Sequence, residues 1–258
     1  MIDVQKQNDT REIDIQKVGV KDVETPLIIQ RKHESNQVVY AKAKMSVSLP
    51  RHYKGTHMSR FIEILNDFKQ KNILGVDIRK MLEVMQKKLE AKSSYLKFDF
   101  KYFIEKIAPV SKMKSLMSYD CFFEGTLDEN DYKFFLGVKV PVTTLCPCSK
   151  EISKAGAHNQ RAIVKAKISY NEDEHIWLED LIDDIETCAS SPLYSLLKRE
   201  DEKFVTESAY DNPKFVEDII RDVVLKFEEN KIIKFYEVEI EAQESIHNHN
   251  AWAYQKSK

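Results

Sequence analysis

Glycine is scarce in this sequence, which has six glycines among 258 residues, whereas an average protein contains about 7%. Dinucleotide-binding and phosphate-binding loops need closely spaced glycines, so that backbone N–H groups can approach a phosphate. The nearest two glycines here are Gly125 and Gly137, 12 positions apart. The sequence therefore excludes both kinds of loop, and a bound nucleotide would have to be held by side chains.

An excess of positive charge is also missing. Lys and Arg number 40, and Asp and Glu number 42, which leaves a formal net charge of −2. Because such a surface has no overall basic field to attract polyanions, we expect neither nucleic acid nor a membrane as a partner. The first residues lack the apolar core of a signal peptide, and no stretch nears the roughly 18 apolar residues of a membrane span. We therefore expect a cytoplasmic protein.

Cysteine is sparse too, with four residues at positions 121, 146, 148 and 188. Their number and irregular spacing do not suit a disulfide framework, and the cytosol would keep them reduced. The composition is otherwise that of a globular protein, with 42% hydrophobic and 32% charged residues. Free thiols in such a chain point to packing, metal binding or catalysis.

Hydrophobic periodicity indicates the same order of elements in both halves of the chain. Alternating apolar residues predict strands at 39–49, 96–104, 117–123, 132–142, 162–170 and 232–242. Apolar residues at helical spacing predict helices at 58–68, 78–89, 178–188 and 216–227. Clean alternation is typical of antiparallel sheets that are covered by helices on one face.

We therefore predict an α+β fold with two tandem units, each an antiparallel sheet with two helices on one face. Residues 1–24 show no sustained period, and we interpret them as an N-terminal arm. The first unit is predicted to span residues 25–130 and the second residues 131–258.

The densest cluster of unusual residues lies between two predicted strands, where Cys146-Pro147-Cys148 is followed by His158. Two thiols two positions apart, with an imidazole 10 to 12 residues later, are ligands of the kind that zinc prefers. A catalytic metal site would leave one coordination position open for water. Cys-Pro-Cys alone is not decisive, because buried cysteines are usually inert. Metal binding and plain packing both stay open at this point.

Four of the seven histidines fall in two short segments, 51–60 and 247–249. His57 and Arg60 lie at a predicted helix start, where free N–H groups favour an anion, although a solvated helix start would have the same composition. His247 and His249 would project to one side of an extended segment, which suits proton transfer or metal binding. The alternative for this pair is a polar strand end.

Taken together, these segments resemble the type IB GTP cyclohydrolase I family, a bacterial, metal-dependent enzyme family with the tunnelling fold. The resemblance covers the chain from about Val39 to its C-terminus. It rests on the segments 144–150 with 156–161, 55–61 and 244–249. It implies two tunnelling-fold units per chain and a homotetramer with active sites at the subunit interfaces. The two units agree with the doubled order of elements.

The resemblance also implies a catalytic metal site, held by Cys146, His158 and Glu200 and completed by water. Zinc or manganese would suit these ligands. Cys148 could equally be the thiolate ligand. Asp201 or Glu202 could take the place of Glu200, because the acidic run at 200–202 is weakly marked.

The implied reaction converts GTP and water into 7,8-dihydroneopterin triphosphate and formate, the first step of folate (tetrahydrofolate) biosynthesis. Metal-activated water would attack C8 of guanine, and His247 and His249 would carry the later proton transfers. Glu244 or Glu217 would accept hydrogen bonds from the guanine N1 and 2-amino groups. The triphosphate would lie near His57 and Arg60, from a neighbouring subunit.

Two other functions use the same residues. Nitrile reductases of the tunnelling fold use a cysteine nucleophile with NADPH and no metal, which would make Cys146 or Cys148 an attacking thiolate. A non-enzymatic module would instead use Cys146, Cys148 and His158 to close a structural zinc site. Bound metal and its sensitivity to chelators separate the three functions.

Overall fold

The computed structural model describes residues 5, 7–68, 72–73 and 75–257. Contacts divide the chain into two compact units. Unit 1 comprises Met1–Lys101 and Phe122–Leu136, and unit 2 comprises Tyr102–Cys121 and Gly137–Lys258. Among the described residues, no helix is both long and apolar enough to span a membrane.

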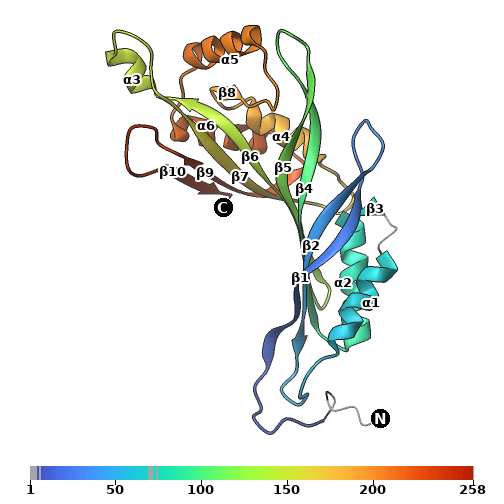
Figure 1. Ribbon diagram of the computed structural model, residues 1–258. Coiled ribbons are helices and arrows are strands. Elements are labelled where there is room, and N and C mark those ends of the chain that lie inside the picture. The colour runs from blue at the N-terminus through green and yellow to red at the C-terminus, as the bar shows by residue number, and fades with distance from the viewer. Residues whose placement is uncertain (1–4, 6, 69–71, 74, 258) are drawn as a thin grey trace. The chain divides into compact units, whose positions relative to one another are not determined.

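Unit 1 is an antiparallel sheet with two helices packed against it (Figure 1). Strand β2 (Gln37–Leu49) pairs with β1 (Ile15–Ile29) on one side and with β4 (Ser93–Ile107) on the other. The short β3 (Asn72–Ile73) runs parallel to the end of β1. Helices α1 (Met58–Phe68) and α2 (Gly75–Leu89) contact each other, and α2 contacts β2.

The side-chain pattern explains this packing. In β2, every second residue from Val39 to Leu49 is buried, so one face of the strand contributes to the core. In α1, the buried residues Phe61, Ile64, Leu65 and Phe68 follow helical spacing and form one face. The predicted helices thus lie where they can cover the apolar face of the sheet.

Strand β1 differs from the predicted N-terminal arm, because residues 15–24 pair with β2. The register shifts between Ile15 and Val18, and again between Val20 and Val23. A bulge places an extra residue in one strand and interrupts the alternation of side chains between the two faces. This is why residues 15–24 show no sustained period in the sequence.

The boundary between the units also differs from the predicted division at residue 130. Strands β4, β5 (Lys114–Asp128) and β6 (Asp131–Leu145) each have 15 residues, and each is divided between the units. A strand of this length extends about 50 Å, well beyond the usual length. Because the alternation runs unbroken along each strand, periodicity cannot show where one unit ends.

Unit 2 repeats the arrangement of sheet and helices. Strand β9 (Ile233–Ala242) pairs antiparallel with β7 (Asn159–Tyr170) and with β10 (Ala251–Lys256), and the short β8 (Ser191–Pro192) pairs with β6. Helix α6 (Val216–Glu229) contacts α4 (Leu178–Glu186), β9 and β10. Two further helices, α3 (Pro147–Ile152) and α5 (Arg199–Asp211), complete the unit.

Candidate active site

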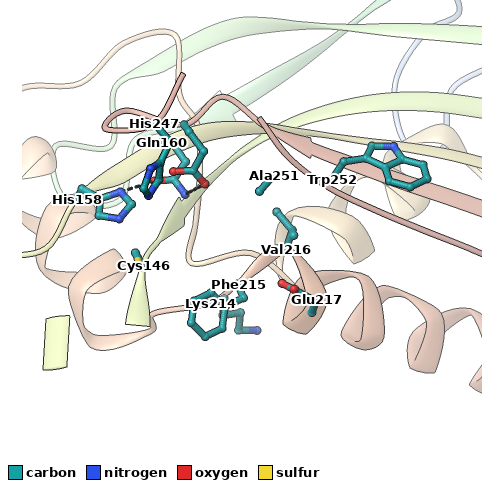
Figure 2. A pocket seen from close by; sticks show the side chains of 11 residues that line it. Cys146, His158, Gln160, Lys214, Phe215, Val216, Glu217, His247, Ala251 and Trp252 are labelled. Atoms are coloured by element: carbon teal, nitrogen blue, oxygen red, sulfur yellow. Dashed lines mark hydrogen bonds between the residues drawn. The ribbon is translucent and has the colours of Figure 1, made fainter. Parts of the chain in front are cut away.

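A pocket of about 360 Å³ lies in unit 2, where the ends of β6, β7, β9 and α6 meet (Figure 2). Its polar lining includes five residues that the sequence singled out: Cys146, His158, Glu217, Glu244 and His247. Gln160 and Lys214 add two more polar groups, and Phe215 and Trp252 add aromatic rings. A thiol, two imidazole rings, two carboxyl groups and aromatic surface thus surround one cavity.

The loop and helix after β6 bring Cys146 and His158 together. Cys146 is the N-cap residue of α3, and its sulfur accepts a hydrogen bond from the Ser149 amide at 3.4 Å. The Ser149 hydroxyl accepts a hydrogen bond from the His158 amide at 3.1 Å. The Cys146 amide in turn donates to the His158 carbonyl at 3.1 Å. These contacts hold the start of α3 beside the start of β7.

The four cysteines lie in different surroundings. Cys146 lines the pocket, whereas Cys148 is exposed and is not among the lining residues. Cys121 and Cys188 are buried, and burial raises the pKa of Cys188 to about 11. A thiol with a raised pKa is a poor nucleophile at neutral pH. The position of Cys146 therefore makes it the thiol that is available to a ligand in the pocket.

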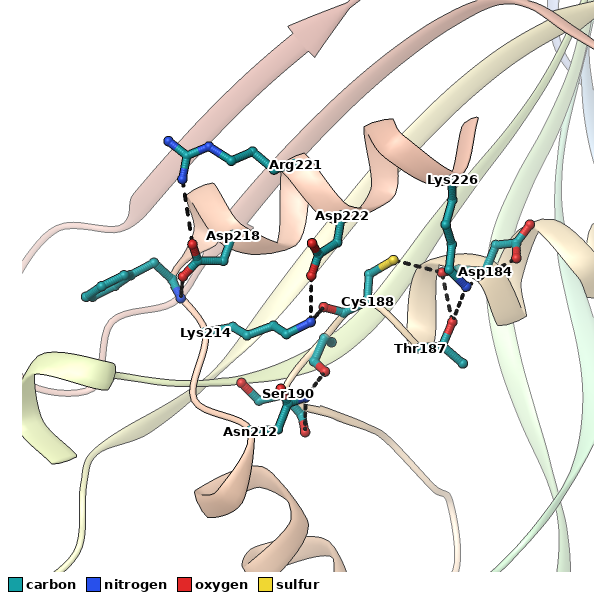
Figure 3. Close-up of polar contacts among 12 residues, drawn as sticks. Asp184, Thr187, Cys188, Ser190, Asn212, Lys214, Asp218, Arg221, Asp222 and Lys226 are labelled. Carbon is teal, nitrogen blue, oxygen red and sulfur yellow. Dashed lines mark hydrogen bonds and ion pairs between the residues drawn. The ribbon is translucent and has the colours of Figure 1, made fainter. Parts of the chain in front are cut away.

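The loop before α6, residues 212–215, forms another part of the pocket wall. The Lys214 amide donates to the Leu145 carbonyl at 3.0 Å, so this loop lies directly beside Cys146. The Lys214 ammonium group donates to Asp222 at 2.6 Å and to the Cys188 carbonyl at 2.8 Å (Figure 3). The side chain of Asn212 donates to the Ala189 carbonyl at 2.9 Å. The loop is thus anchored at several points, which places Glu217 at the pocket.

The two glutamates of the pocket differ in exposure. Glu217 lies in the first turn of α6 and is exposed. Glu244 is half-buried, and its Oε2 atom is buried without a hydrogen-bond partner among the described residues. The side chain of Glu217 is therefore open to solvent at the pocket, whereas the protein covers one oxygen of Glu244.

His158, Gln160 and Glu244 form a row of hydrogen-bonded side chains along the pocket wall. The Nδ1 atom of His158 lies 3.1 Å from Oε1 of Gln160. The side-chain amide of Gln160 donates to Oε1 of Glu244 at 3.2 Å. Sequence reasoning missed Gln160 as an individual residue, although it lies within the segment 156–161 that carried the resemblance.

The two histidines after β9 lie together, although their segment is not extended. Residues 245–249 form bends between β9 and β10. The rings of His247 and His249 nevertheless stack, with centroids 5.3 Å apart and planes inclined by 16°. His247 lines the pocket, and the ring of His249 stacks on the ring of His247.

The structure does not bring Glu200 to the pocket. Lys150 of α3 donates to the Tyr210 carbonyl near the C-terminal end of α5. Glu200 lies at the opposite end of α5, about 15 Å further along a helix that rises 1.5 Å per residue. Its side chain is exposed. Among the described residues, no group of three or more His, Cys, Asp or Glu is placed to hold a metal ion.

Asp201, the neighbour of Glu200, has a structural role that uses both of its carboxylate oxygens. Oδ1 accepts from the amides of Val110 and Ser111, and Oδ2 accepts from the Ser111 hydroxyl and the Lys198 amide. Burial alone would raise the pKa of Asp201, but these hydrogen bonds outweigh it and hold the pKa well below its usual range. Asp201 therefore caps α5 and fastens the turn at 110–111.

Asp201→Asn is expected to lower the midpoint of thermal unfolding at pH 7 by several degrees, because an amide cannot accept all four hydrogen bonds. The contribution of Asp201 is complete above the ordinary pKa of 3.8 and is lost as the pH falls through the lowered value. The difference between the protein and the variant should therefore shrink in acid. Glu202→Gln, one residue away and exposed, is the control and should leave the midpoint unchanged. An equal midpoint for Asp201→Asn would contradict this role.

His57 and Arg60, the predicted triphosphate-binding residues, belong to unit 1 and are not among the residues that line the pocket. The Arg60 guanidinium donates to the Lys88 carbonyl near the C-terminal end of α2 at 2.5 Å. Within the chain, Arg60 thus joins α1 to α2.

Comparison with known proteins identifies the family. The family described as "Type I GTP cyclohydrolase folE2" matches residues 1–253. The chain belongs to this family. GTP cyclohydrolase FolE2 of Geotalea uraniireducens is 54% identical over 253 residues, which cover 98% of this chain and 92% of that protein. FolE2 of Thermosipho africanus is 49% identical over 253 residues, covering 98% of this chain and 96% of that protein.

Solved structures confirm the predicted fold class of the folE2 chain. The uricase from Bacillus fastidious matches with a TM-score of 0.58 and 9% identity, covering 94% of this chain and 92% of that one. The uricase from Arthrobacter globiformis matches with a TM-score of 0.54 and 7% identity, covering 93% of this chain and 92% of that one. At such low identity the likeness establishes the fold alone, which is the α+β tunnelling fold.

Proposed function

We propose that this protein is a type IB GTP cyclohydrolase I, which converts GTP and water into 7,8-dihydroneopterin triphosphate and formate in the cytoplasm. This is the first step of tetrahydrofolate biosynthesis. The observation that carries the proposal is that one pocket, in a folE2 family member, is lined by Cys146, His158, Glu217 and His247. Its volume of about 360 Å³ lies within the range of small-molecule sites.

The donor groups of the pocket fit a divalent metal, zinc or manganese. Cys146 and His158 are adjacent, and the contact of His158 Nδ1 with Gln160 leaves Nε2 as the ring nitrogen for a ligand. Sulfur and imidazole nitrogen are ligands that zinc prefers. When bound, the metal supplies the Lewis acidity that makes water a nucleophile near neutral pH. Cys146 and His158 would be the two ligands from this pocket.

Glu200, the third ligand that the resemblance implies, stays a prediction because it lies outside the pocket in the chain described here. Metal content tests it directly. If Glu200 is a ligand, Glu200→Gln should lose zinc or manganese on dialysis, whereas Glu202→Gln, the same change at an exposed glutamate two positions further along, should retain the metal of the unmodified protein. Equal retention would remove Glu200 from the ligand set.

Glu217 is the group we assign to the guanine ring. The N1 and 2-amino hydrogens of guanine lie side by side and require two acceptor atoms that are both accessible. Glu217 is exposed at the pocket, whereas Oε2 of Glu244 is covered by protein. Of the two glutamates that the sequence left open, the difference in exposure favours Glu217. Glu244 also lines the pocket, and its Oε1 atom accepts a hydrogen bond from Gln160.

His247 and His249 are the proposed proton carriers. Opening of the imidazole ring of guanine, release of formate and closure of the pterin ring each move protons, and histidine exchanges protons readily near neutral pH. His247 lines the pocket, and the stacked ring of His249 lies behind it. Both side chains are exposed, so protons can also pass between this pair and solvent.

The triphosphate group requires cations that the pocket of one chain does not supply in full. We assign this role to His57 and Arg60 of a neighbouring subunit in a homotetramer, with active sites at the subunit interfaces. Arg60 uses one guanidinium nitrogen for the Lys88 carbonyl and retains other N–H donors for phosphate oxygens. Size measurement in solution tests the tetramer independently of catalysis.

The alternatives have less support. Membership of the folE2 family favours a cyclohydrolase over a nitrile reductase. A structural zinc module built from Cys146, Cys148 and His158 would need all three side chains in one place, and Cys148 does not line the pocket.

The test is an incubation with GTP after metal removal and reloading with Mn²⁺ or Zn²⁺. Formate and the fluorescent pterin obtained by oxidation should appear in equal amounts in the reloaded protein and should be absent when a chelator is present. The absence of both products with either metal would overturn the proposed function.

A further inference from the structure

We propose that Gln160 is a positioning residue that sets the tautomer of His158 and holds Glu244 in place. The inference rests on the proposed function in one respect only, which is that His158 is a ligand of a metal. The hydrogen bonds that carry it belong to the chain itself. They run from His158 Nδ1 to Gln160 Oε1 at 3.1 Å and from Gln160 Nε2 to Glu244 Oε1 at 3.2 Å.

The direction of this row of hydrogen bonds is determined at the Glu244 end. Oε1 of Glu244 faces the amide group of Gln160, and a carboxylate oxygen can only accept a hydrogen bond. The NH₂ group of Gln160 must therefore face Glu244, which turns its Oε1 atom towards His158. Because an amide oxygen is also an acceptor, Nδ1 of His158 must be the nitrogen that has the hydrogen.

The consequence for His158 is a single neutral tautomer. With hydrogen on Nδ1, the lone pair lies on Nε2, the ring nitrogen that is not engaged by Gln160. A lone pair on an imidazole nitrogen is what a divalent metal binds. A partner of this kind is a general feature of metal-binding histidines, where the second nitrogen donates to a neighbouring acceptor.

His158 Nδ1 has a second neighbour, Ser245, which could not select one tautomer by itself. The Ser245 hydroxyl lies 3.3 Å from Nδ1 of His158 and is exposed. A hydroxyl can donate or accept, so Ser245 alone would stabilise either tautomer. Only the amide of Gln160, oriented by Glu244, favours one of them.

Gln160→Met tests the inference, because methionine keeps the length of the side chain and removes both hydrogen bonds. Solid-state ¹⁵N NMR of metal-free protein labelled in the histidine rings reports the tautomer of His158, whose signal is identified by its loss in His158→Ala. The unmodified protein should show one tautomer with hydrogen on Nδ1, and Gln160→Met should show a mixture. Gln243→Met, the same change at an exposed glutamine beside Glu244, is the matched control and should keep the single tautomer.

Co²⁺ affinity provides the second measurement, through the absorption of the cobalt–thiolate bond. Loss of an outer partner of a metal ligand typically weakens metal binding about 10- to 100-fold, and we expect a loss in this range for Gln160→Met. Gln243→Met should bind Co²⁺ as the unmodified protein does.

Gln160→Glu separates the two roles of the residue. A carboxylate at position 160 still accepts from Nδ1 of His158, so the tautomer and most of the Co²⁺ affinity should remain. It repels Glu244 instead of donating to it, so the pocket wall should be disturbed and KM for GTP should rise more than kcat falls.

The outcomes separate this inference from the proposed function. An unchanged tautomer and unchanged Co²⁺ affinity in Gln160→Met would overturn the role of Gln160, whatever the protein does with GTP. A protein without cyclohydrolase activity, but with the tautomer change and the loss of Co²⁺ affinity, would overturn the proposed function and retain the role of Gln160.

Discussion

Replacing Cys146 by alanine is expected to reduce formate release from GTP by more than about 100-fold. Loss of a residue that hydrogen-bonds to a metal ligand already costs about 10- to 100-fold in metal affinity or activity, and Cys146→Ala removes a proposed ligand itself. Bound metal should be lost with the activity. The fold should survive, since Cys146 is only partly buried and caps a six-residue helix. Loss of a helix cap costs about 1 kcal/mol. Metal content, formate release and the unfolding midpoint are the measurements.

Two variants serve as controls for Cys146→Ala. Cys148→Ala removes the exposed thiol of the same motif and should retain the metal. His247→Ala should retain the metal but slow turnover, because we assign His247 to proton transfer and not to metal binding. Near wild-type formate release by Cys146→Ala would remove Cys146 from the site, and loss of metal from His247→Ala would make that histidine a ligand.

Replacing Glu217 by glutamine is expected to lower kcat/KM for GTP about 100-fold while the metal stays bound. Each hydrogen bond to a charged group contributes about 1.5 kcal/mol or more, and two such bonds to guanine correspond to about 3 kcal/mol. In the variant, an NH₂ group would face one of the guanine donors. Steady-state kinetics with GTP and Co²⁺ binding to the same sample separate substrate recognition from metal binding.

Glu244→Gln is the matched control for Glu217→Gln, because it makes the same change at the other carboxylate of the pocket. It should weaken Co²⁺ binding, since an amide at position 244 no longer determines the orientation of Gln160. Inosine triphosphate, which lacks the 2-amino group, should be a poorer substrate than GTP, and Glu217→Gln should reduce that preference. If Glu217→Gln instead retains full kcat/KM and full preference for GTP, Glu217 does not bind guanine.

The local sequence was sufficient for the elements that bury one face. The alternation in β2 and the apolar residues of α1, α4 and α6 predicted strands and helices, because burial imposes periods of 2 and 3.6 residues on the chain. The bulged part of β1 and the division of the long strands between units were not predictable in this way. A bulge interrupts the period, and an unbroken period continues through a change of unit.

The residues of the candidate site also differ in how far the sequence alone could predict them. Cys146, Cys148 and His158 lie within a short span of the chain, and their residue types indicated metal binding as one of two interpretations, whereas Gln160 was not singled out. The acidic run at 200–202 contains three carboxylates that the sequence cannot distinguish. The structure sets Asp201 apart, since Asp201 is buried in four hydrogen bonds whereas Glu200 and Glu202 are exposed at one end of α5.

The sequence by itself therefore determined the fold class, the absence of a glycine-rich phosphate loop and the segments that supply the thiol and imidazole groups. These depend on composition and on neighbours along the chain. Tertiary structure decided which cysteine faces the pocket, which glutamate is open to a ligand and which amide orients His158. These depend on contacts between residues far apart in the sequence, such as Gln160 with Glu244 and Lys214 with Leu145, for which one sequence contains no local signal.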